Sequence, residues 1–113
     1  MADHIRIAPA SGTWVARAEG AVIAESRGAL ELAEGLRSPV VYFPRSDVAM
    51  ALMEPSERVT RCPHKGQTVY FHIIGPGGRI DDAAWSYEAP IPDAAAIAGH
   101  VAFDPALVTV ERL

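Results

Sequence analysis

Cysteine and lysine are almost absent from this chain of 113 residues, which contains one of each, Cys62 and Lys65. A single cysteine forms no internal disulfide and cannot supply the paired thiolates of a Cys-x-x-Cys zinc site. The four histidines also lack a regular metal-ligand spacing, so we expect no metal and no cofactor. Low cysteine usage makes the reducing cytoplasm the expected location.

Long apolar runs are lacking as well. No stretch approaches the roughly 18 residues that a membrane span needs, and residues 1–9 show no signal-peptide core. We therefore expect a cytoplasmic protein with no membrane partner. The net charge of −4 makes nucleic acid an unlikely main partner, although Arg58, Arg61 and Lys65 leave a local basic patch. The abundance of alanine, and of arginine over lysine, suggests a bacterial source with a GC-rich genome.

The length fits one domain over residues 1–113, large enough to build a core without disulfides. Glycine and proline recur at short intervals and separate segments rich in β-branched and aromatic residues. The predicted strands cover residues 4–8, 13–18, 21–26, 40–43, 58–62, 68–74, 83–87, 100–103 and 108–111. This pattern predicts a mainly β, single-domain antiparallel sheet fold, either a sandwich or a partly open barrel.

One or two short helices are expected among these strands. Asp47, with Ser46, is placed to cap a helix over residues 48–53, and Asp93 to cap one over residues 94–97. Residues 29–36 have helical propensity but also alternate, and their short length between glycines favours a strand.

The first candidate site is the pentapeptide Cys62-Pro63-His64-Lys65-Gly66, which groups a thiol, an imidazole and a primary amine. Proline and glycine favour a tight hairpin turn between the two flanking strands. One interpretation is purely structural, with Cys62 as a small buried hydrophobe and Lys65 in water. The other is chemical, because neighbouring positive charge favours the reactive thiolate of a partly exposed cysteine.

Two further clusters allow the same pair of interpretations. Trp85 and Tyr87 share one face of a strand, as the wall of a pocket or as core residues. Arg45 and Asp47 follow a strand end, where scaffolds often present functional groups, or serve as a solvated arginine and a helix cap.

Taken together these motifs resemble the domain of unknown function 427 family. The resemblance rests on segments spread over nearly the whole chain: Val22 to Ser26, Tyr42-Phe43-Pro44-Arg45-x-Asp47-Val48, Cys62-Pro63-x-Lys65-Gly66-x-x-x-Tyr70, Ala84-Trp85-x-Tyr87-x-x-Pro90 and Ile97-x-x-x-Val101-Ala102-Phe103. It implies a small bacterial or fungal β-rich domain similar to the Mss4-like or β-tent folds. The paired cysteines that hold zinc in related folds are missing here. The family also carries a nucleotidyltransferase-like label, but Asp81-Asp82 is the only adjacent acidic pair that could hold magnesium.

The leading hypothesis is a pocket for a small anionic or carbonyl-bearing ligand around the Cys-Pro-His-Lys-Gly turn. Cys62 and Lys65 are the candidate catalytic residues, and the candidate ligand-binding residues are Arg45, Asp47, Tyr70, Trp85 and Tyr87. Two alternatives remain open. One is a non-catalytic interaction module or homodimer, and the other is a nucleotidyltransferase-like enzyme.

Overall fold

Ten β-strands form three antiparallel sheets in residues 5–113, the part of the chain that the computed structural model describes. The strands are β1 (Ile5–Pro9), β2 (Trp14–Ala18), β3 (Ala21–Ser26), β4 (Leu30–Glu34), β5 (Val40–Tyr42), β6 (Met53–Cys62), β7 (Gly66–Gly75), β8 (Gly78–Ser86), β9 (Val101–Phe103) and β10 (Thr109–Arg112). The predicted mainly β, antiparallel class is confirmed. The finer likeness to Mss4-like or β-tent folds stays a prediction.

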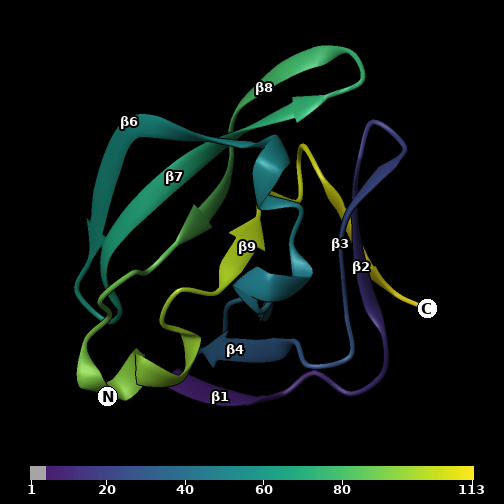
Figure 1. Cartoon of the computed structure of the whole chain (residues 1–113). Helices are drawn as coiled ribbons and strands as arrows, with labels where there is room; N and C mark the ends of the chain where they lie inside the picture. Colours follow the sequence, from purple (N-terminus) through teal and green to yellow (C-terminus); the bar gives the residue numbers. More distant parts are fainter. Residues whose placement is uncertain (1–4) are drawn as a thin grey trace.

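The three sheets have the orders β1-β4-β5, β10-β2-β3 and β6-β7-β8-β9. In Figure 1 the long strands β6, β7 and β8 occupy one side, the β2–β3 hairpin stands on the other, and β1 and β4 cross below. β9 joins the sheets in the middle, since Val101 pairs with Ser86 of β8 and also forms a bridge with Phe43 just after β5. The β7–β8 turn reaches the β2–β3 turn, where the Gly77 N–H donates to Glu19 Oε1 at 2.8 Å.

Two hydrophobic clusters hold the sheets together. The first packs Ile23 of β3 with Phe43, Phe71 and Phe103 and so joins the β10-β2-β3 sheet to the four-stranded sheet. The second joins the β1-β4-β5 sheet to β9 and to the segment after β8, through Leu32, Tyr42, Tyr87, Ala94, Ile97 and Ala102. The candidate pocket borders this second cluster.

Most strand predictions are confirmed, with shifted ends. Glu19 and Gly20 have φ values of 52° and 84°, the left-handed pair that the tight β2–β3 turn requires. The alternating segment 29–36 forms β4, as favoured. Ile5 and Ile7 lie on the inner face of β1, whereas the His4 part of that prediction lies outside the described residues.

The helix predicted over residues 48–53 is reduced to a single 3₁₀ turn. The structure has two 3₁₀ turns, η1 (Arg45–Asp47) and η2 (Met50–Leu52), and Asp47 lies inside η1 instead of capping a helix. Val48 between them is extended, because it forms a β-bridge with Ala24. The predicted helix after Asp93 is the 3₁₀ segment η3 (Pro92–Ile97), again with the aspartate inside it. No helix in residues 5–113 is long and apolar enough to cross a membrane.

Candidate ligand-binding pocket

The Cys-Pro-His-Lys-Gly motif forms the tight hairpin turn that its proline and glycine predict. The Lys65 N–H donates to the Cys62 carbonyl at 3.2 Å, and Gly66 then pairs with Cys62 across the hairpin. Gly66 has φ +118°, and a Cβ there would lie 3.3 Å from Pro90 Cα. Glycine is therefore needed both for the backbone conformation and for the close approach of the Pro90 segment.

That close approach buries Lys65, which the structural interpretation of the sequence had placed in water. The Ile91 N–H donates to the Lys65 carbonyl at 2.9 Å and holds the β8–η3 connection over the turn. Lys65 is only 9% exposed, and its Nζ donates to Glu34 Oε1 at 2.6 Å. The ammonium also lies 5.8 Å from the centre of the Tyr87 ring. The expectation that Lys65 lies in water is therefore wrong, because the lysine forms a buried ion pair.

The two partners stabilise each other's charge. Burial alone would raise the pKa of Glu34, but the hydrogen bond and charge of Lys65, with the charge of Arg37, bring it below its usual value. Burial likewise opposes protonation of Lys65, yet the hydrogen bond from Nζ to Glu34 leaves the pKa of the amine above its usual value. Lys65 is therefore a protonated donor at neutral pH.

A cavity of about 320 Å³ opens beside this ion pair, and we call it the polar cavity. Its walls combine hydroxyl groups, aromatic rings and charged groups. The lining residues are Val40, Tyr42, Arg58, Thr60, Arg61, Cys62, Lys65, Thr68, Tyr70, Asp82, Trp85, Tyr87 and Asp104.

Strand alternation explains why these side chains meet. Arg58, Thr60 and Cys62 are spaced by two along β6, so they share one face of the sheet. Across the sheet Thr60 faces Thr68, and Tyr70 faces Trp85. The hydroxyls of Thr60 and Tyr70 are hydrogen-bonded at 3.0 Å.

The opposite wall comes from β5. The Trp85 indole N–H donates to the Tyr42 hydroxyl at 3.3 Å. Tyr42 is buried, and this burial raises the pKa of its hydroxyl, which stays neutral. Burial also raises the pKa of Tyr87. Neutral phenols keep their O–H bonds, so this wall supplies donors as well as aromatic surface.

Five of the predicted site residues meet at the polar cavity, namely Cys62, Lys65, Tyr70, Trp85 and Tyr87. Trp85 and Tyr87 do line one cavity together. Cys62 is half-buried and packs against the hydrophobic cluster of Tyr42 and Tyr87.

Arg45 and Asp47 do not line this cavity, contrary to the expectation of one shared pocket. Arg45 ties the β8 end to the β9 start, donating to the Gly99 carbonyl at 2.8 Å and to Glu88 at 2.5 Å. Asp47 accepts a 2.7 Å hydrogen bond from Ser26 at the end of β3. Both contacts join distant parts of the backbone, which is a structural role.

Glu34 is the residue that the sequence interpretation missed. It lies 31 positions before Lys65, so no local motif connects the two. One signal was present, because Leu30, Leu32 and Glu34 alternate along β4 and Glu34 falls on the inner face. A carboxylate on the inner face of a strand requires a buried partner.

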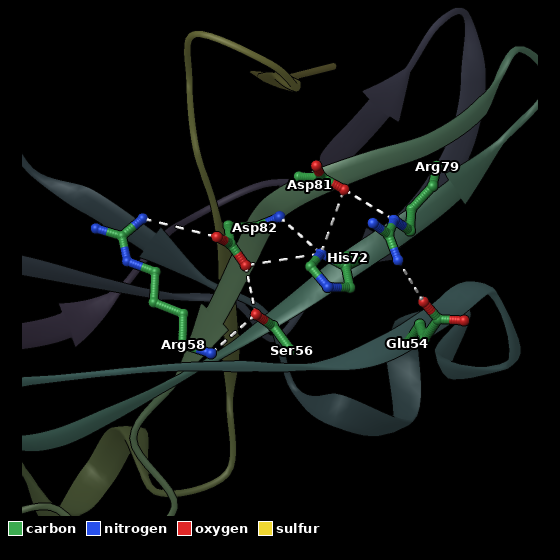
Figure 2. A network of polar contacts seen from close by, with 7 residues as sticks. All are labelled: Glu54, Ser56, Arg58, His72, Arg79, Asp81 and Asp82. Atoms are coloured by element: carbon green, nitrogen blue, oxygen red, sulfur yellow. Dashed lines mark hydrogen bonds and ion pairs between the residues drawn. The ribbon is translucent and has the colours of Figure 1, made fainter.

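Arg58 and Asp82, at the end of the polar cavity away from Lys65, belong to a polar network that continues outside the cavity (Figure 2). Ser56 Oγ donates to Asp82 Oδ1 at 2.5 Å, and the Asp82 backbone N–H donates to His72 Nδ1 at 3.1 Å. Asp82 also lies 4.0 Å from Arg58 Nη1, and the Arg58 guanidinium lies 4.5 Å from the centre of the Tyr70 ring. These contacts hold Asp82 at a φ of +50°, which is uncommon for a residue other than glycine.

The outer part of the network lies in solvent. Arg79 Nε donates to Asp81 Oδ1 at 2.8 Å, and its Nη1 lies 3.5 Å from Glu54 Oε1. Asp81 and Asp82 both lie near His72, but Asp81 also contacts Arg79, whereas Asp82 contacts Ser56 and Arg58, as Figure 2 shows. Within residues 5–113, no group of three or more His, Cys, Asp or Glu side chains is placed to hold a metal ion.

Comparison with known proteins places the chain in a family. A model of the domain of unknown function (DUF427) matches residues 6–113, nearly the entire chain. The chain belongs to this family. No curated protein matches it. The family description names no activity, so the function has to be argued from the pocket.

Proposed function

We propose that the polar cavity binds a small molecule through a carbonyl oxygen, with the Lys65 ammonium as the principal donor. The proposal rests on one observation: Lys65 is buried in an ion pair with Glu34 and also lines the polar cavity. Buried charged groups are costly unless they are paired. An ammonium has three N–H bonds, and the bond to Glu34 uses one of them.

The proposed role of Lys65 is binding rather than nucleophilic attack. A nucleophilic lysine needs a lowered pKa so that its neutral amine is present near neutral pH. The pKa of Lys65 is raised, since Glu34 accepts a hydrogen bond from the ammonium. Lys65 is thus suited to hold an acceptor oxygen.

The charge balance of the cavity favours a single carbonyl or carboxylate over a phosphate group. The lining cations are Arg58, Arg61 and Lys65, and the lining anions are Asp82 and Asp104. Glu34 behind Lys65 brings the local charge close to zero. A multiply charged ligand would gain little from such a balanced set. The nucleotidyltransferase-like alternative gains no support from this balance.

Aromatic rings supply the remaining contact surface. Tyr70, Trp85 and Tyr87 surround the space beside Lys65 and offer flat apolar faces with polar tips. The Cys62 thiol completes this wall, and binding does not require it to react. Pockets that combine apolar walls with a few fixed polar groups are typical of small-ligand sites.

The test is an NMR titration of the full chain with probes that differ in one group. Acetamide and acetate carry a carbonyl oxygen, ethanol lacks it, and inorganic phosphate carries the higher charge. We expect acetamide and acetate to shift the amide signals of Cys62, Lys65 and Tyr87. Ethanol and phosphate should shift them much less. Shifts that are equal for acetamide and ethanol would refute carbonyl recognition.

A variant should remove the donor without leaving a buried unpaired charge. The double substitution Lys65→Met with Glu34→Leu does this, and we expect it to abolish the acetamide-dependent shifts. Arg79→Met, which removes a cation outside the polar cavity, is the matched control and should bind as the parent does. Cys62→Ser should also retain binding. Unchanged acetamide binding by the folded double variant would refute the role of Lys65.

A further inference from the structure

A second cavity of about 320 Å³ adjoins the polar cavity, and we call it the apolar cavity. Its lining contains two tryptophans, Trp14 and Trp85, together with Phe103, three valines and two prolines. Glu31 is its single charged lining residue among those described. The apolar cavity thus offers almost no hydrogen-bonding groups, in contrast to its neighbour.

The two cavities share a wall. Val40 of β5 and Trp85 of β8 line both of them, so the same two side chains separate the spaces. One hydrogen bond of the Trp85 ring, from its Nε1 to the Tyr42 hydroxyl at 3.3 Å, holds the ring in this partition. Trp85 itself is only half-buried. A ligand that spans both spaces requires this ring to rotate.

We propose that one amphipathic ligand occupies both cavities, with its carbonyl head beside Lys65 and an apolar arm in the apolar cavity. This inference rests on the proposed function of the polar cavity and adds the chemical class of the ligand. Each cavity alone lies at the lower limit of ligand-site volumes, about 300 Å³, whereas the two together lie well inside the usual range.

The chemistry of the two linings gives the expected ligand class. Lys65 and the phenols of Tyr42 and Tyr87 provide donors for one oxygen. The valines and aromatic rings beyond Trp85 provide dry contact for an alkyl or aryl chain. A medium-chain carboxamide or carboxylate has both parts. The balanced charge around Lys65 makes the neutral carboxamide the better probe.

The experiment is a binding series of straight-chain amides from acetamide to octanamide, measured on the full chain by tryptophan fluorescence. Trp14 and Trp85 are the only tryptophans; Trp14 lines the apolar cavity and Trp85 lines both cavities, so the signal reports on both. Trp14→Phe assigns the change to Trp85. We expect affinity to rise by about two- to fourfold per added methylene group, and then to level off once the arm fills the apolar cavity. A parallel series of carboxylates shows whether a charged head is also accepted.

Two variants locate the arm. Val110→Phe should fill part of the apolar cavity and lower the affinity for octanamide at least tenfold, while acetamide binding stays unchanged. Val110→Thr, of nearly the same size, should reduce the gain per methylene group and serves if the phenylalanine variant does not fold. An affinity that does not depend on chain length, or variants that weaken short and long amides equally, would overturn the shared ligand.

A variant at the site of the carbonyl head distinguishes failure of the shared-ligand proposal from failure of the proposed function. Lys65→Met with Glu34→Leu should weaken every amide in the series by the same factor. If the series keeps its chain-length dependence but ignores this variant, the carbonyl head is not bound at Lys65 and both proposals fail. If only acetamide and its short homologues depend on Lys65, the polar cavity binds ligand by itself and the shared ligand alone is refuted.

Discussion

The two ends of the polar cavity hold charge in opposite ways. At one end Lys65 and Glu34 form a single ion pair that is almost fully buried. At the other end Arg58, Asp82 and their neighbours form a network of several partners with substantial solvent exposure. Both ends place cationic side chains beside the same cavity, yet their energetic consequences differ.

The difference shows what each end can contribute. A buried pair is rigid and tolerates the substitution of either residue poorly, since removing one partner leaves the other charged and desolvated. The exposed outer part of the network, around Arg79 and Asp81, is adaptable, because water replaces any lost partner there at little cost. A precise donor for a ligand therefore fits the Lys65 end, whereas the Arg58 end is suited to adjust around whatever is bound.

The largest expected effect comes from breaking the buried pair. Lys65→Met should lower the free energy of unfolding by about 3–5 kcal/mol, because it leaves Glu34 buried without its partner. Urea denaturation at neutral pH measures this loss. Replacing both residues, as Lys65→Met with Glu34→Leu, should recover most of it. Equal losses in the single and double variants would show that the pair itself is not the cause.

Gly66 follows Lys65 and Gly78 precedes Arg79, and these two glycines give the next comparison. Gly66 and Gly78 share a φ of +118°, but a Cβ at Gly78 meets nothing within 4 Å, whereas one at Gly66 meets the Pro90–Ile91 backbone. Alanine at either site should cost about 1–3 kcal/mol for the backbone conformation. Crowding should add about 1 kcal/mol or more at Gly66 alone. The measurement is the same urea denaturation, and similar losses at both glycines would mean that the Pro90 segment moves away freely.

The buried pair should also make the stability depend on pH, but this effect should be smaller. Burial and the ion pair shift each pKa in opposite directions, so the net shifts are limited. The folded pKa of Glu34 lies below its usual 4.5, so its contribution is complete above that value and is lost as pH falls through the folded pKa. The folded pKa of Lys65 is raised above 10.5, so its contribution is complete below that value and is lost as pH rises through the folded pKa.

Urea midpoints between these two pH limits should accordingly form a plateau. The double variant Lys65→Met with Glu34→Leu should flatten the acid side relative to the parent chain. The alkaline side should keep a slope, because the raised pKa values of Tyr42 and Tyr87 also favour the folded protein until the phenols ionise. An acid side that is identical in both proteins would contradict the assignment to Glu34.

The smallest effect is expected at the outer edge of the exposed network. Arg79→Gln removes contacts to Asp81 and Glu54, but all three side chains are more than half exposed. We expect no measurable change in the urea midpoint, at low or high salt. A loss as large as that of Gly78→Ala would mean that these exposed contacts stabilise the fold, and the contrast with the buried pair would then fail.

Local sequence patterns predicted much of the fold and part of the pocket. Pro63 and Gly66 marked a tight turn, and Glu19-Gly20 a second one, because these residues restrict backbone geometry by themselves. Trp85 and Tyr87 were placed on one face by a spacing of two, and they line one cavity. In each case the deciding interaction acts within a few residues.

Predictions failed where a distant segment decides the conformation. Residues 48–53 have helical propensity, but the Ala49 N–H donates to the Ile23 carbonyl at 2.8 Å, and this contact keeps the backbone extended at Val48. Arg45 was predicted to share a pocket with Cys62 and the other candidate residues. Its guanidinium instead donates hydrogen bonds to Gly99 and Glu88, more than forty residues later. Propensity is a weak preference that such contacts override.

The sequence by itself determined that this chain is rich in antiparallel strands, that Cys62 to Gly66 forms a turn, and which aromatic residues face the same way. Alternation and turn chemistry are local properties, so they can be read without the fold. Only the tertiary structure decided that Lys65 is buried on Glu34 and that Trp85 divides two cavities. These features depend on which strands become neighbours, and burial then turns a surface charge into a paired donor beside a cavity.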